Sequence, residues 1–234
     1  MFFDEKNSLF ILLDGVTRVH SEYDERPYKS ASAEVGDIFI DELVANISDN
    51  IDHPDPEFIL TNAIRSANAK IKTYRDQKSK SDWDFYPATL GVVGLVRGNV
   101  LYYVGIGDCL CVLIRNNAKM LFGKEWTLEA LDKLAVTKTE RYGEYCNHTE
   151  NALSYTVFNG DDEVMAGISC SFIDLHKGDV LFIASDGISD YIKFEKSKDL
   201  IFQHPKQMIE LSTKYDIPPF AEYADDKTVI KISF

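Results

Sequence analysis

The chain has 234 residues, and its 25 Lys and Arg against 38 Asp and Glu give a formal net charge of −13. Such a negative field repels nucleic-acid phosphates and anionic lipid headgroups, so we expect neither nucleic acid nor a membrane as a partner. Hydrophobic residues make up 45% and charged residues 27%, which is ordinary for a folded protein and argues against disorder, collagen or coiled coil.

Two further features of the sequence bear on its location. No apolar run approaches the ~20 residues of a membrane helix, and acids follow Met1 where a signal peptide would carry positive charge. A cytoplasmic location is therefore expected. The cysteines are unevenly spaced, which predicts reduced thiols rather than a disulfide framework; they are Cys109, Cys111, Cys146 and Cys170.

The first predicted strand covers Leu9–Leu13, and two predicted helices follow it. In the first helix, apolar residues recur at helical spacing over Val35–Ile47, with acids between them. The second helix has Asp55 as a cap and Pro56 in its first turn, and it also carries an apolar face. Because both helices are amphipathic, we expect them to pack on a sheet.

The rest of the chain reads mainly as strands, because its apolar runs are short and rich in β-branched and aromatic residues. Turn residues such as Arg97-Gly98-Asn99 and Asn116-Asn117 favour an antiparallel meander over repeated βαβ units. Short helices are expected from Ile188 and over 205–214, whereas 122–151 has no clear pattern. The strands are predicted at 92–96, 100–106, 110–114, 154–158, 168–173, 180–184 and 228–233.

The sequence has neither an internal repeat nor a linker rich in Pro, Gly or Ser. Helices followed by a long run of antiparallel strands are typical of the α+β class. We therefore predict one α+β domain over residues 1–234.

Four aspartates stand at ends of predicted strands: Asp14, Asp108, Asp186 and Asp225. Each one alone fits a turn residue, because Asp-Gly is a common turn signal. However, no strand-like run directly follows the Asp-Gly pairs at 14 and 186, as it would after a two-residue hairpin loop. Carboxylates that converge at the edge of an apolar layer repel one another unless a cation compensates them. Together the aspartates indicate a metal site.

Five motifs, taken in order, resemble the metal-dependent protein phosphatases of the 2C type, also called PPM. The resemblance covers nearly the whole chain, and it implies a sandwich of two antiparallel β-sheets flanked by helix pairs. It also implies that the substrate is a protein phosphorylated on serine or threonine. The motifs are Leu12-Leu13-Asp14-Gly15, Ala88-Thr89-Leu90, Gly105-Ile106-Gly107-Asp108, the run from Gly178 to Asp190, and Asp225-Asp226-Lys227-Thr228-Val229-Ile230.

The same resemblance implies metal ligands, with Mg²⁺ or Mn²⁺ as the ions. Asp14 would bridge two ions, and a water between them would attack phosphorus, so that no protein nucleophile is required. Oxygen ligands suit such hard cations. The implied ligands are Asp14 and the Gly15 carbonyl for one ion, Asp14, Asp186 and Asp225 for the other, and Asp108 and Asp190 for an outer or third ion.

The sequence departs from the 2C-type pattern in two places. The acidic motif and the arginine that the family places about one strand before the first Asp-Gly do not precede Asp14 here. We therefore expect the ion beside the Gly15 carbonyl to bind weakly. Val16-Thr17-Arg18 also replaces the usual glycine pair. Arg18 is the candidate phosphate ligand, since a guanidinium matches phosphate geometry, and a solvated loop arginine is the alternative.

Three other interpretations stay open on the sequence alone. A pseudophosphatase would keep the fold as a regulatory binding module without turnover. An unrelated antiparallel sandwich would bind calcium through its loop aspartates. Cys109 and Cys111 fall on one strand face, either as packing residues or as half of a zinc site with Cys146 and His148. The sequence does not indicate an oligomeric state.

Overall fold

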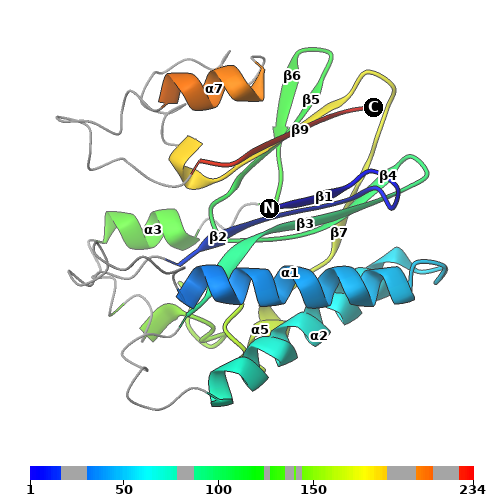
Figure 1. Ribbon diagram of the computed structural model, residues 1–234. Helices are drawn as coiled ribbons and strands as arrows, with labels where there is room; N and C mark the ends of the chain where they lie inside the picture. Colours follow the sequence, from blue (N-terminus) through cyan, green and yellow to red (C-terminus); the bar gives the residue numbers. More distant parts are fainter. Residues whose placement is uncertain are drawn as a thin grey trace.

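The computed structural model describes residues 1–16, 31–77, 87–123, 127–134, 140, 144–188, 204–212 and 227–234. These residues form two β-sheets packed face to face, with helices on both outer sides (Figure 1). Every strand pairing in the two sheets is antiparallel. The predicted α+β sandwich is therefore confirmed.

The larger sheet has five strands in the order β1-β2-β3-β4-β7. The prediction for β4 was correct to the residue, whereas β2 and β3 are longer than predicted and β1 was not predicted. The bounds are Phe2–Asp4 for β1, Leu9–Gly15 for β2, Thr89–Arg97 for β3, Val100–Ile106 for β4 and Ser171–Asp174 for β7.

The smaller sheet has four strands in the order β6-β5-β8-β9. Asn116 and Asn117 both have positive φ, at 50° and 63°, and form the β5–β6 turn, as their residue type predicts. The bounds are Leu110–Arg115 for β5, Ala118–Leu121 for β6, Val180–Ala184 for β8 and Val229–Ser233 for β9.

Helices α1 and α2 lie side by side along the five-stranded sheet, and α7 lies on the opposite side of the sandwich (Figure 1). At the start of α2, Oδ1 of Asp55 accepts a hydrogen bond from the Glu57 amide at 3.0 Å, so the predicted cap is present. None of the described helices is long and apolar enough to cross a membrane. The bounds are Ala31–Asp49 for α1, Pro56–Gln77 for α2, Thr127–Lys133 for α3, Val164–Gly167 for α5 and Pro205–Ser212 for α7.

Strand β2 shows how the sequence separates the two larger cores. Leu9 and Ile11 belong to the core beneath α1 and α2, whereas Phe10 and Leu12 belong to the core between the sheets. Successive side chains of a strand point to opposite faces, so this alternation follows from the sequence. By the same period of two, Asp14 falls on the face of β2 that looks toward the smaller sheet. A third core joins that sheet to α7.

The strand predicted at 154–158 is wrong. This segment makes only isolated β-bridges, because the buried side chain of Asn147 takes the place of a neighbouring strand. Its Nδ2 donates to the Val157 carbonyl at 3.1 Å, and its Oδ1 accepts from the Val157 amide at 2.9 Å. The strand predicted at 168–173 begins only at Ser171. A side-chain amide can satisfy backbone groups that an apolar pattern assigns to a ladder.

Candidate metal centre

In the five-stranded sheet, the end of β2 and the end of β4 lie on either side of the start of β3. Asp14 is paired with Leu90 of β3, and Ile106, the last residue of β4, is paired with Gly91. Asp108 follows β4 by two residues. The register therefore places Asp14 and Asp108 at the same edge of the sheet.

In the four-stranded sheet, the start of β5, the end of β8 and the start of β9 lie together. Ala184, the last residue of β8, is paired with both Leu110 and Val229. Asp108 stands just before β5, and Asp186 stands just after β8. Because the chain crosses between the sheets at Asp108, both sheets contribute carboxylates to one edge of the sandwich, which we call the strand-end edge.

The buried thiol of Cys109 lies in the field of three of these carboxylates. Burial raises the pKa of Cys109 well above its ordinary value, and the charges of Asp14, Asp108 and Asp186 raise it further. Three carboxylates from three strand ends thus act on one thiol, which is itself 1% exposed. Carboxylate charges brought to one edge attract cations.

The carboxylates of the strand-end edge are partly buried. Asp14, Asp108 and Asp186 are all of intermediate exposure, and Oδ1 of Asp186 is removed from solvent. Removing carboxylate oxygens from water costs free energy unless their charge is compensated. Carboxylate and carbonyl oxygens are the donors that Mg²⁺ and Mn²⁺ prefer. The chemistry of the donors therefore fits such an ion.

Part of the predicted ligand set is outside the described residues. Asp190 and Asp225 belong to that part, as does the candidate phosphate ligand Arg18, so their roles stay predictions. Within the described ranges, no three His, Cys, Asp or Glu side chains form a group that could hold a metal ion. Asp14, Asp108 and Asp186 come to one edge without making a complete site by themselves.

The carbonyl of Gly15 points away from β3. The Val16 amide donates to the Ala88 carbonyl at 3.0 Å, and Gly15 stands opposite Thr89 in the ladder. Along two antiparallel strands, every second pair of facing residues makes no hydrogen bonds to each other. Gly15 and Thr89 form such a non-hydrogen-bonded pair. Thr89 directs its own amide and carbonyl to Phe158, at 3.0 and 2.8 Å. The pairing of β1 with β2 stops short of Gly15, so its carbonyl is directed outward.

Sequence reasoning missed the hydroxyl groups around this segment. Oγ1 of Thr89 donates to the main-chain carbonyl of Asp14 at 2.7 Å, and Oγ of Ser32 donates to the Val16 carbonyl at 3.2 Å. Thr89 belongs to one of the five motifs, which was the only signal for it in the sequence. Ser32 carried no signal.

A serine hydroxyl also hydrogen-bonds to the main chain beside a predicted ligand in the smaller sheet. The Ser185 amide donates to the Thr228 carbonyl at 3.0 Å, and the Thr228 amide donates to Oγ of Ser185 at 3.0 Å. The β8–β9 pairing thus continues one residue past the strands, directly before Asp186. Ser185 is 2% exposed, so this hydrogen bond is shielded from water.

The cysteines do not gather into a zinc site. Cys109 and Cys111 pack in the core between the sheets, whereas Cys146 packs in the core beneath α1 and α2. All four cysteines carry free thiols. Burial raises the pKa of Cys111 to about 12. The same-face pair therefore packs as small apolar side chains, which was one of the two predicted roles.

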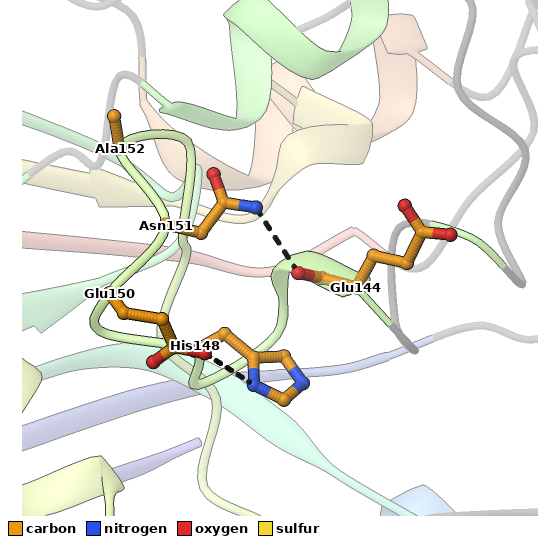
Figure 2. A pocket seen from close by; sticks show the side chains of 5 residues that line it. All are labelled: Glu144, His148, Glu150, Asn151 and Ala152. Carbon is orange, nitrogen blue, oxygen red and sulfur yellow. Dashed lines mark hydrogen bonds and ion pairs between the residues drawn. The ribbon is translucent and has the colours of Figure 1, made fainter.

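A pocket of about 540 Å³ opens elsewhere, in the segment between α3 and α5 (Figure 2). His148 Nδ1 lies 3.3 Å from Glu150 Oε1, and Asn151 Nδ2 donates to the Glu144 carbonyl at 3.3 Å. Ala152 completes the lining. Of the predicted metal ligands that the structure describes, none lines this pocket.

Comparison with known proteins supports the fold. No model of a protein family matches the sequence, and no curated protein matches it. Solved structures do. The catalytic domain of the serine/threonine protein phosphatase PstP, in complex with two manganese ions, is 20% identical with a TM-score of 0.59, and the match covers 95% of this chain and 96% of that one.

Two further phosphatases have the same arrangement. Stp1 from Staphylococcus aureus is 17% identical with a TM-score of 0.61, covering 100% of this chain and 86% of that one. The PPM Ser-Thr phosphatase MsPP from Mycobacterium smegmatis, in complex with cacodylate, is 17% identical with a TM-score of 0.57, covering 99% and 93%. This chain thus has the fold of the PPM-type Ser/Thr phosphatases.

Proposed function

We propose that this protein is a metal-dependent phosphatase that acts on phosphoserine and phosphothreonine in proteins. The observation that carries the proposal is the strand register that places Asp14, Asp108 and Asp186 at one edge of a PPM-type fold. A fold alone does not imply an activity. Carboxylates from three strand ends, however, are costly to gather and suit a cation-dependent reaction on a phosphate.

The proposed cofactors are Mg²⁺ or Mn²⁺ ions. When bound, they would supply the positive charge and Lewis acidity for attack of water on phosphorus. Asp14 would bridge two ions, as the resemblance to the 2C-type phosphatases implies, and it lies on the face of β2 that looks toward the smaller sheet. The remaining proposed ligands are the Gly15 carbonyl, Asp186 and Asp225, with Asp108 and Asp190 toward an outer ion.

In this proposal the side chains bind and orient the ions and the phosphate, and none of them forms a covalent bond to the substrate. Cys109 is the thiol nearest to the proposed centre, and its raised pKa and burial make it a poor nucleophile. Water is therefore the proposed nucleophile. Arg18 would bind the phosphate of the substrate through its guanidinium.

A regulatory binding module without turnover is the second candidate. It keeps the same fold and the same aspartates, and two of the proposed ligands, Asp190 and Asp225, lie outside the described residues. Such a pseudophosphatase would bind a phosphorylated partner at the strand-end edge through a bound cation, without hydrolysing it. The two candidates differ in turnover and not in fold.

The test is hydrolysis of p-nitrophenyl phosphate and of a phosphothreonine peptide, with Mn²⁺ and with chelator. We expect Mn²⁺-dependent turnover that falls by at least about a hundredfold in Asp186→Asn, because that change removes a charged ligand. Asp162→Asn is the matched control, since Asp162 is 81% exposed and pairs with Lys72 on α2. Binding of Mn²⁺ without turnover would favour the binding module, and absence of both would contradict the two candidates.

A further inference from the structure

Two hydroxyl groups bracket the outward carbonyl of Gly15. Thr89 donates to the carbonyl before it, that of Asp14, and Ser32 donates to the carbonyl after it, that of Val16. The Ala88 carbonyl accepts the Val16 amide. The backbone on both sides of Gly15 is thus held, while the Gly15 carbonyl itself is directed away from β3.

Thr89 is rigidly placed to hold this backbone. It is 1% exposed, and its amide and carbonyl both bond to Phe158. The Phe158 ring stacks on Phe39 of α1 with centroids 4.3 Å apart. The hydroxyl is therefore fixed against the core and cannot follow the Asp14 carbonyl if that peptide rotates. A buried hydrogen bond between fixed groups restricts orientation as well as adding stability.

Ser32 holds the other side of Gly15 from the first turn of α1. A Cβ atom placed on Gly15 would lie 3.2 Å from Cβ of Ser32. The helix thus packs directly against this glycine, and the Ser32 hydroxyl reaches past it to Val16. The Ser32 bond is longer than the Thr89 bond, and Ser32 is only half-buried. We therefore expect the weaker effect from Ser32.

We propose that Thr89 and Ser32 are positioning residues that fix the direction of the Gly15 carbonyl toward a bound divalent cation. The inference rests on the proposed function, because it needs a metal at Gly15. A carbonyl ligand binds an ion only if its peptide plane has the right orientation. The Val16 amide bond to Ala88 holds the Gly15 plane directly, and the two hydroxyls keep the peptides on either side from rotating with it. Neighbours that orient metal ligands typically contribute 10–100-fold to metal affinity.

The test is the weaker of the two Mn²⁺ Kd values of the full chain, since the ion beside the Gly15 carbonyl is the one expected to bind weakly, measured by electron paramagnetic resonance of the free ion. Thr89→Val removes the donor at nearly constant volume, and we expect about tenfold weaker binding. Thr89→Ser keeps a hydroxyl and should restore binding to within about twofold of the original. Ser32→Ala should weaken binding by about threefold. Thr73→Val is the matched control, since its Oγ1 donates to the Ala69 carbonyl at 3.1 Å on the exposed side of α2.

The outcomes separate this inference from the proposed function. If the parent protein binds Mn²⁺ and both Thr89→Val and Ser32→Ala bind it equally well, the positioning role is wrong and the function stands. A lower melting temperature with an unchanged Kd would likewise assign the hydroxyls to folding alone. If the parent binds no Mn²⁺, both the proposed function and this inference are wrong. Should Thr89→Val not fold, Ser32→Ala decides, because its site is half-buried at a helix start.

Discussion

The two ends of the β5–β8 strand pair differ in what surrounds their carboxylates. At one end, Asp179 is 1% exposed and is held by Arg115, with Nε 2.9 Å from Oδ1 and Nη2 2.7 Å from Oδ2. The His176 amide donates to the same carboxylate at 2.8 Å. At the other end, Asp108 precedes β5 and Asp186 follows β8, and both raise the pKa of a buried thiol.

The difference concerns the source of the compensating charge. The Arg115 guanidinium lowers the pKa of Asp179, so the chain itself stabilises this buried anion. At the strand-end edge, Asp14 adds a third carboxylate to the other two. Carboxylates brought to one edge repel one another, and a bound cation offsets that repulsion. One end of the strand pair thus stabilises the fold, and the other is suited to a cation from solution.

The largest expected effect on the melting temperature comes from removing Arg115 from its pair with Asp179, which we call the compensated end of the strand pair. Arg115→Met would leave Asp179 buried without its guanidinium, and we expect the melting temperature to fall by about 10 °C. Asp186→Asn, measured with chelator present, should change it by no more than about 2 °C, because it removes a charge from a repulsive group. Differential scanning calorimetry measures both. Equal losses in the two variants would show that both ends serve stability.

The next effect is specific to the strand-end edge. Saturating Mn²⁺ should raise the melting temperature by about 5 °C, because a ligand that binds only the native state stabilises it. Asp186→Asn should lose most of this shift, while Arg115→Met should keep it despite its lower starting value. If Asp186→Asn responds to Mn²⁺ as fully as the parent, Asp186 is not a metal ligand.

The compensated end also predicts a dependence of stability on pH. The pKa of Asp179 is lower in the folded protein than its ordinary value of 3.8. Its contribution to the free energy of unfolding is therefore present above that ordinary value and lost as the pH falls toward the folded-state pKa. Urea denaturation between pH 5 and pH 3 should show a steeper loss in the parent than in Arg115→Met. Identical slopes would mean that the pair does not set this dependence.

The sequence predicted which aspartates lie at the strand-end edge better than it predicted the long-range hydrogen bonds at the two ends of the strands. Asp14, Asp108 and Asp186 could be found because each follows an apolar run, and antiparallel strands bring such ends together. The Thr89 bond to Asp14 joins residues 75 apart, and the Arg115 bond to Asp179 joins residues 64 apart. Neither bond leaves a periodic signal, since each depends on which strands become neighbours.

The errors in secondary structure have a similar physical cause. Strand β2 was predicted from a continuous apolar run that is buried on both faces, and helix α1 from the regular apolar period of its one buried face. The run at 154–158 has a strand-like composition, yet Asn147 satisfies its backbone from the side. Strand β6 was missed because all four of its residues are exposed, so an apolar pattern does not mark it. Apolar patterns indicate burial, and hydrogen-bond partners depend on tertiary structure.

The smallest expected effect concerns Cys109, the thiol nearest the three carboxylates. Cys109→Ala removes one buried sulfur from the core between the sheets, and we expect about 1 kcal/mol of destabilisation from the lost packing. Its Mn²⁺-induced shift in melting temperature should match that of the parent, because the proposed ligands are all oxygens. Cys111→Ala is the matched control, since both thiols are 1% exposed and only Cys109 has the aspartates among the causes of its raised pKa. A shift lost in Cys109→Ala and kept in Cys111→Ala would make the thiol a metal ligand, and the strand-end edge would then select softer ions than Mg²⁺ or Mn²⁺.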